Sequence, residues 1–293
     1  MISNIFIHPE EERLRTGWRI FFQLILLTLL IVFIAPLLFG LGALSPVLAF
    51  LADEFLIQAV AIIASIYFAR RWFDQRSLVS LGIRWDDLAI RDLLFGIFVP
   101  ALLFGIIFLL EWALGWLEFE GFAWQQSEFS IAPVGYYFFG FILVGFYEEL
   151  LSRGYQLQNL AEAIGLRWAI FASSAIFSLL HLANPSASIA SVLGILAAGY
   201  FLAYPYLLTG SLWISIGLHI GWNFFEGPVF GFPVSGLETT ALLIHSDTGP
   251  ALITGGSFGP EAGFIVLPIM AIGAGLTYLY VQGRQPIAIE EVS

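Results

Sequence analysis

The sequence predicts an all-α fold, a polytopic bundle of about eight transmembrane helices with both termini in the cytoplasm. Hydrophobic residues make up 59% of the 293 residues, and charged residues make up only 11%. Soluble domains carry about 25% charged residues. The apolar residues gather in runs close to the length of about 20 residues that a bilayer requires. We therefore treat residues 1–293 as a single transmembrane domain.

The predicted spans are apolar runs at roughly 18–41, 47–69, 92–114, 133–163, 167–184, 188–208, 211–226 and 263–281. Pro36 breaks the first run late and Asn184-Pro185 stops the fifth, because proline removes a helical hydrogen bond and restricts the residue before it. The fourth run is expected as one long helix that ends ahead of Gly165. A glycine-rich loop of about 35 residues precedes the eighth run.

Arginine placement predicts the orientation. The eleven basic residues are all arginine, and the chain has no lysine. With eight spans, every arginine outside the apolar runs falls on one side, which the positive-inside rule makes cytoplasmic. The opposite side collects the acidic residues Glu111, Glu118, Glu120, Glu128, Glu226, Glu238, Asp247 and Glu261. Only Arg153 is not explained by this rule, because it lies within a span beside the glutamate pair.

The charge balance and the residue types exclude several functions. The net charge is −11, and so few scattered basic residues do not suit nucleic-acid binding. The absence of cysteine excludes disulfides, thiolate catalysis and cysteine metal sites. The chain has no lysine, so no Ser/Lys dyad marks a serine nucleophile.

Ionisable residues inside the apolar runs mark the candidate site, because a charge at membrane depth costs several kcal/mol. Glu148 lies before the turn near residue 164, and His181 lies after it. A rise of about 1.5 Å per residue places both roughly 25 Å from that turn. The same count puts His219 and Asn223 roughly 15–21 Å past the next turn. Residues from three spans are therefore expected near one level.

Helical spacing separates the two adjacent glutamates. Glu149 and Arg153 are four residues apart, so they share one helix face and an ion pair is expected. Glu148 points about 100° away from Glu149 and can face something else. His219 and Asn223 are also four apart and can point into one pocket.

These side chains suit the hydrolysis of an amide. A carboxylate can take a proton from water, and histidine and asparagine can donate hydrogen bonds to an oxyanion. Glu148, His181 and His219 also match the ligand set of catalytic zinc, although their spacing is not HExxH. The residues alone leave both designs open.

Two readings belong to other functional classes. A proton-coupled transporter would use Glu148 and the histidines as a relay. The chain shows no internal repeat and no paired broken helices, which argues against it. A non-catalytic membrane scaffold or immunity protein would retain the same residues from an ancestral enzyme without using them for catalysis. For either histidine alone, a helix–helix hydrogen bond is an equally good reading.

Three short motifs resemble those of the CPBP family, which comprises the CAAX proteases and the bacteriocin-processing enzymes of the Abi group. They read Glu148-Glu149-Leu-Leu-Ser-Arg153 for EExxxR, Phe177-Ser-Leu-Leu-His181 for FxxxH, and His219-Ile-Gly-Trp-Asn223 for HxxxN. Each motif alone is weak, but the ordered set within apolar runs is specific. The motif-bearing catalytic core is about residues 130–226.

The resemblance implies an intramembrane endopeptidase built as an eight-helix bundle. In such an enzyme Glu148 would be the general base that activates water, and His181 would help to hold that water. His219 and Asn223 would form the oxyanion hole. Glu149 and Arg153 would organise the site.

The resemblance also bears on cofactors, partners and location. No cofactor is expected, and the alternative is a divalent metal, zinc, since the family has also been described as metal-dependent. The expected partners are a peptide or membrane-protein substrate and membrane lipid, with no nucleic acid. The expected location is the cell membrane, which in a prokaryote is the plasma or inner membrane.

Overall fold

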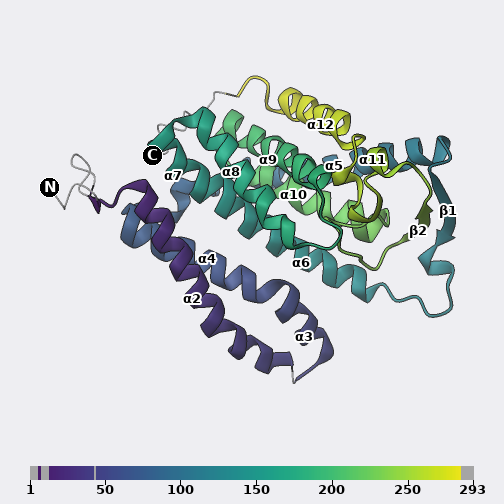
Figure 1. Ribbon diagram of the computed structural model, residues 1–293, viewed down its shortest axis with the longest axis horizontal. Helices are drawn as coiled ribbons and strands as arrows, with labels where there is room; N and C mark the ends of the chain where they lie inside the picture. Colours follow the sequence, from purple (N-terminus) through teal and green to yellow (C-terminus); the bar gives the residue numbers. More distant parts are fainter. Residues whose placement is uncertain (1–5, 8–12, 43, 285–293) are drawn as a thin grey trace.

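The computed structural model describes residues 6–7, 13–42 and 44–284, and these form a helical bundle (Figure 1). The main helices are α2 (Thr16–Gly42), α3 (Pro46–Leu51), α4 (Ile57–Ala69), α5 (Ala89–Ala113), α6 (Ala132–Glu149), α7 (Leu157–Ile164), α8 (Leu166–Leu180), α9 (Ile189–Thr209), α10 (Trp213–Phe224), α11 (Ala251–Thr254) and α12 (Val266–Val281). Four π-helical segments extend or join them: Ala52–Leu56, Arg70–Asp74, Leu150–Gln156 and Phe225–Val229. The predicted all-α polytopic membrane bundle is confirmed.

Within the described residues, six helical stretches are long and apolar enough to cross a membrane, and they correspond to the first six predicted spans. The predicted seventh and eighth spans are α10 and α12, which have 12 and 16 residues and are shorter than this criterion requires. The chain is a multi-pass membrane protein. The cytoplasmic location of the termini stays a prediction, and the outermost residues of both lie outside the described ranges.

The predicted fourth span is continuous from Ala132 to Ile164, but its middle is not α-helical. A seven-residue π-helical segment, Leu150–Gln156, begins directly after the glutamate pair, and all its residues are buried. Such segments are rare and occur often at functional sites. The hydrophobic pattern does not reveal the change from α-helix to π-helix. The pattern shows which face of a helix is apolar, but it does not show to which carbonyl oxygen each backbone N–H donates.

Two short strands were expected as loops. β1 (Leu117–Phe122) pairs antiparallel with β2 (Leu243–Asp247), with Leu117 opposite Asp247. More than a hundred residues separate the strands, so the sequence contains no short turn between them that would predict the pairing. The pairing of β1 with β2 connects the segment after α5 to the long loop before α11.

Helix α10 lies at the centre of the bundle and packs against α5, α6 and α9. Residues Trp213–Asn223 are all buried. Ile214, Leu218 and Trp222 face the core shared with α5, α9 and α12, whereas Ile216 and Ile220 face the core shared with α4 and the π segment after α6. An all-round apolar helix of this kind belongs in the interior.

Glycines bring the neighbouring backbones close to α10. A methyl group on Gly217 would overlap the carbonyl oxygen of Leu93 in α5. A methyl group on Gly145 in α6 would lie 2.7 Å from Ile220 Cγ1. Small residues at such crossings allow the close helix packing typical of membrane bundles. The glutamate pair of α6 is thereby held one turn beyond a close α6–α10 contact.

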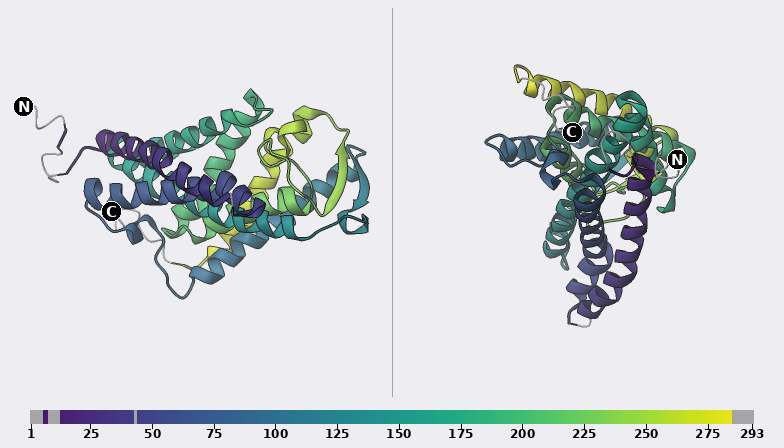
Figure 2. Two further views of the ribbon diagram at one scale, coloured as in Figure 1. Left: turned by 90° about the horizontal axis from the view of Figure 1, so that it is seen from below. Right: turned by 90° about the vertical axis from the view of Figure 1, so that its left-hand side faces the viewer.

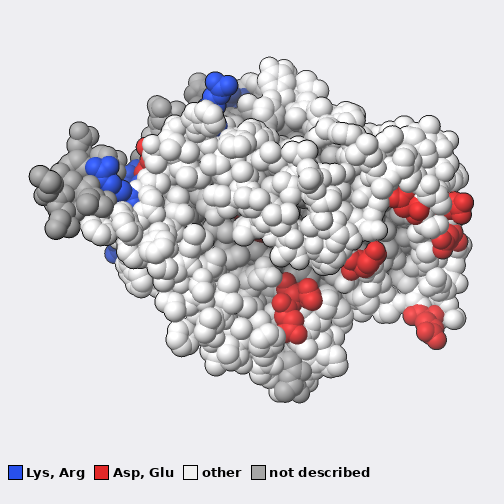
Figure 3. Space-filling model, in the orientation of Figure 1, with Lys and Arg blue, Asp and Glu red and all other residues white. Residues whose placement is uncertain are grey.

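Helices α2, α3 and α4 form an arm that projects from the rest of the bundle (Figures 1 and 2). Few residues of the apolar stretch of helix α2 are buried, as expected of a helix that faces lipid. On the face drawn in Figure 3, arginines lie in the left half, and acidic side chains lie mainly at the right and below the centre. This separation agrees with the orientation that the arginines predict.

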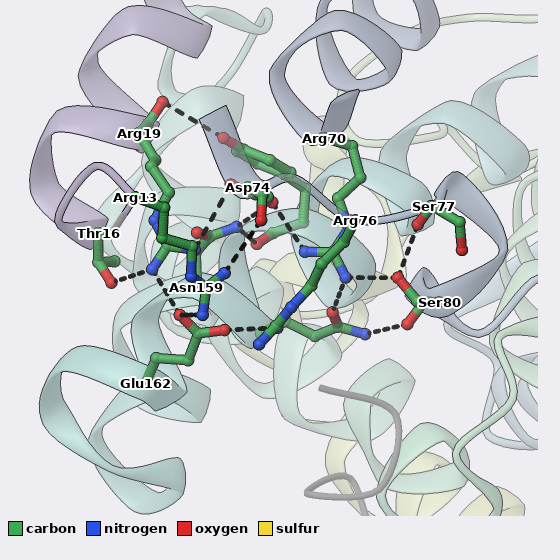
Figure 4. Close-up of polar contacts among 12 residues, drawn as sticks. Arg13, Thr16, Arg19, Arg70, Asp74, Arg76, Ser77, Ser80, Asn159 and Glu162 are labelled. Atoms are coloured by element: carbon green, nitrogen blue, oxygen red, sulfur yellow. Dashed lines mark hydrogen bonds and ion pairs between the residues drawn. The ribbon is translucent and has the colours of Figure 1, made fainter. Parts of the chain in front are cut away.

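A buried polar network joins the arm to α7 (Figure 4). Asp74 Oδ2 accepts a hydrogen bond from Arg70 Nη1 at 2.7 Å, and Asp74 Oδ1 lies 3.5 Å from Arg19 Nη1. Glu162 of α7 pairs with Arg19 and with Arg76, whose Nη1 is 2.6 Å away. The network therefore fixes the ends of α2, α4 and α7 that carry these side chains relative to one another.

Candidate active site

One cavity of about 80 Å³ brings the candidate residues of the three motifs together. Glu148 of α6, His219 and Asn223 of α10, and His181 at the end of α8 all line it. The volume has room for several water molecules. The shared level that helix rise predicts for these residues is therefore observed.

Glu148 is the glutamate that faces this cavity. Its side chain is 24% exposed, whereas that of Glu149 is 0% exposed. Glu148 Oε2 lies 3.7 Å from His219 Nε2, too far for a hydrogen bond. Among the described residues, this oxygen has no hydrogen-bond partner. The carboxylate is thus poised to bind something that enters the cavity.

Glu149 is buried beneath the cavity and holds two other motif residues. The expected ion pair is present, since Arg153 Nη1 donates to Glu149 Oε1 at 2.7 Å. The same oxygen lies 2.7 Å from His219 Nδ1, a contact that the sequence does not predict. Because the carboxylate accepts from Nδ1–H, the Nε2 edge of His219 is directed toward Glu148. Glu149 thereby sets the orientation of the ring.

His181 is positioned by the end of α8. The helix stops at Leu180, and His181 begins a 3-10 turn ahead of Asn184-Pro185. His181 Nδ1 lies 2.8 Å from the carbonyl oxygen of Phe177, so the proton sits on Nδ1 and Nε2 is left as the acceptor. A water in the cavity can therefore donate to this nitrogen.

Phe177 connects the three motifs, a role that the sequence analysis did not assign. The guanidinium carbon of Arg153 lies 4.3 Å from the centre of its ring. The ring centres of His181 and His219 lie 4.7 and 6.0 Å away. The phenyl group therefore supports the arginine by a cation–π contact and packs against both histidines.

The cavity also contains residues from the long segment between α10 and α12. Ser235 and Glu261 of this segment line it, together with Trp222 of α10. Trp222 Nε1 donates to Glu261 Oε1 at 2.9 Å, and Ser235 Oγ donates to Glu261 Oε2. From its position in the sequence, Glu261 was predicted only to be one of the acidic residues on the side opposite the arginines. No periodic pattern in the loop could have located it, because the loop folds back through irregular turns.

In the part of the chain that the structure describes, no three His, Asp or Glu side chains are arranged to hold one metal ion. Glu148, His181 and His219 share a cavity but do not form a ligand set. As they are arranged in the described part of the chain, these three side chains do not fit a zinc ion.

Comparison with known proteins decides the family of the motif-bearing segment. Residues 129–225 match the family model described as type II CAAX prenyl endopeptidase Rce1-like. This segment is similar to that family, and the match covers less than half of the chain. The predicted resemblance is thus confirmed. No curated protein and no solved structure gives a significant match to the chain. The Rce1-like segment runs from α6 to α10 and contains all three motifs, whereas Ser235 and Glu261 lie outside it.

Proposed function

We propose that this protein is an intramembrane endopeptidase that hydrolyses a peptide bond with water activated by Glu148. One observation supports this proposal most. Within the Rce1-like segment, an accessible carboxylate shares a small buried cavity with two histidines and an asparagine. A transporter or a scaffold does not require these groups to meet in an enclosed space.

Glu148 acts as the general base in the proposed reaction. A water molecule donates one hydrogen bond to Glu148 and one to Nε2 of His181. Glu148 takes a proton as the water oxygen bonds to the carbonyl carbon of the substrate. When the C–N bond breaks, the protonated Glu148 returns that proton to the leaving amine. The products are a carboxylic acid and an amine, Glu148 is again ionised, and no metal is required.

His219 and Asn223 stabilise the negative oxygen of the tetrahedral intermediate. The side-chain amide of Asn223 donates one hydrogen bond, and Nε2–H of His219 donates another. His219 can donate from both nitrogens when its ring is doubly protonated, with Nδ1–H directed to Glu149. A charged donor also strengthens the bond to the oxyanion. Glu149 and Arg153 act through His219 and are positioning residues.

The proposed substrate is a peptide or a membrane-protein segment that reaches the cavity from the cell membrane, with lipid as the other partner. The Rce1-like family is described by its prenyl endopeptidase activity. We propose cleavage of a peptide bond for this chain.

The proposed function is tested with purified protein in liposomes, incubated with a broad peptide library in water labelled with heavy oxygen. Mass spectrometry reads the products. We expect defined new termini and one labelled oxygen in each new carboxyl group, because water is the nucleophile. Folded protein that cleaves no peptide, whether soluble or membrane-anchored, would contradict the proposal.

A further inference from the structure

A carboxylate that the proposed reaction does not use faces the same cavity. Glu261, in the 3-10 turn Pro260–Ala262, lines the cavity together with Glu148, His181 and His219. The residue is only 4% exposed, so its carboxylate is withdrawn from solvent. It lies beyond residues 129–225 and is therefore outside the segment that matches the family model.

Two neutral donors fix the Glu261 carboxylate in place. Trp222 donates to one of its oxygens at 2.9 Å, and Ser235 donates to the other. An ionised carboxylate has about four lone-pair sites for hydrogen bonds. Each oxygen can therefore accept another bond from a group in the cavity. Because the orientation is already set, a ligand would meet a preorganised acceptor.

Glu226 places a second carboxylate behind the first. It follows Trp222 by four residues on the same helical stretch and is fully buried. Among the described residues, neither of its carboxylate oxygens has a hydrogen-bond partner. It lies close enough for its charge to interact with that of Glu261. Two adjacent buried carboxylates are costly unless one of them is protonated or positive charge accompanies them.

Apart from His181 and His219, which the proposed reaction already uses, the described lining of the cavity has no basic side chain to supply that charge. No arginine is among its described lining residues, and the chain has no lysine. Arg153, beneath the site, is already paired with Glu149. The lining does include Ile195, Phe201 and Leu202, which suit an aliphatic stem. Lysine and arginine combine such a stem with a charged head.

We propose that Glu261, supported by Glu226, is a specificity determinant that binds the basic side chain of a lysine or arginine next to the scissile bond. This inference rests on the proposed peptidase function and names the substrate class. The ammonium or guanidinium head donates to the open acceptor sites of Glu261 and compensates the buried negative charge. Its stem packs on the apolar lining.

The kinetic test uses peptides that differ only in lysine or norleucine at the positions flanking the cleaved bond. We expect wild-type protein to prefer the lysine peptide by about tenfold or more in kcat/KM, as a hydrogen bond to a charged group predicts. Glu261→Gln keeps the shape and an acceptor for Trp222 but loses the charge, so the preference should disappear. Glu238→Gln, an exposed outer-loop variant, should keep it. Loss of activity toward both peptides with the preference unchanged would indicate a structural role only and would overturn the proposal.

A binding test on the Glu148→Gln protein separates this inference from the proposed function. We expect this variant to bind the lysine peptide about tenfold more tightly than the norleucine peptide. Glu148→Gln combined with Glu261→Gln should bind both equally. If wild-type protein cleaves no peptide but Glu148→Gln still binds the lysine peptide more tightly than the double variant does, the site for a basic residue is supported and the proposed hydrolysis is contradicted. Equal binding of both peptides by Glu148→Gln overturns the site, even if Glu261→Gln fails to fold.

Discussion

Glu149 Oε1 lies 2.7 Å from Arg153 Nη1 and 2.7 Å from His219 Nδ1, so one carboxylate oxygen joins the first motif to the third. The adjacent glutamates consequently differ in role. Glu149 organises the buried side of the site, and Glu148 faces the cavity. The π-helical segment that begins at Leu150 carries Arg153 on the next turn.

Glu149→Gln should lower both stability and activity. The amide cannot balance the charge of the buried Arg153, and leaving such a charge unpaired costs about 3–5 kcal/mol. Thermal unfolding in detergent measures the first effect, and peptide cleavage measures the second. The double variant Glu149→Leu with Arg153→Met should recover stability but not activity, because His219 still lacks its orienting partner. Recovery of activity in that double variant would show that His219 does not depend on Glu149.

Phe177→Ala should destabilise the protein by about 3–5 kcal/mol, the usual cost of removing a buried phenyl ring. It removes the surface beneath Arg153 and the packing against both histidines. Phe177→Leu retains most of the volume and should unfold at a temperature between those of wild type and Phe177→Ala. Equal stability of the two variants would rule out a packing role for the ring.

Gly217→Ala should loosen the contact between α5 and α10, because the added methyl group would overlap the carbonyl oxygen of Leu93. We expect a lower unfolding temperature and a loss of cleavage, since α10 carries His219 and Asn223. Gly275→Ala in α12 is the matched control. Its added methyl group meets no atom within 4 Å, and alanine is the better helix former. The control should be as stable as wild type or slightly more stable.

Asp74→Asn should weaken the attachment of the arm. The buried Arg70 would lose its charged partner, at a cost of about 3–5 kcal/mol, whereas Arg19 would keep its ion pair with Glu162. Asp86→Asn removes an exposed carboxylate whose ion-pair distance to Arg84 is 3.9 Å, and it should be nearly neutral. Proteolysis between α2 and α4, followed by gel analysis, reports whether the arm has loosened. Identical digestion of both variants would count against the network.

Removal of divalent metal should leave activity unchanged under the proposed mechanism. Protein dialysed against a strong chelator is compared with untreated protein, and metal content is measured on the same samples. Restoration of lost activity by zinc alone would replace the Glu148-activated water with a metal-bound water. Such a result would require Glu148, His181 and His219 to rearrange into a ligand set.

The sequence predicted that the motif residues lie at one level along their helices and which of them share a helix face, because helix geometry is regular. A fixed rise placed Glu148 and His181 at one level, and a four-residue spacing paired Glu149 with Arg153. The bond from His219 to Glu149 did not follow. It depends on how α6 and α10 are rotated about their axes, which close contacts such as that of Gly145 with Ile220 determine.

Glu261 could not be placed from the sequence for a different reason. Its loop has no hydrophobic period, and its path is set by individual contacts, such as the bond from Asn184 Nδ2 to the carbonyl oxygen of Ser235. Pairing of strands β1 and β2 was missed because their partners are remote in the chain. Local patterns determine elements, whereas loops that return to a site depend on tertiary contacts.

Turnover by Glu148→Gln tests the central claim most directly. Glutamine keeps the shape of the side chain but cannot accept a proton from water, so kcat/KM should fall by about a hundredfold to ten-thousandfold. The unfolding temperature should stay near that of wild type, because Glu148 is partly exposed and makes no hydrogen bond within the described residues through Oε2. Glu238→Gln serves as the control and should cleave normally. Wild-type turnover by folded Glu148→Gln protein would contradict the account.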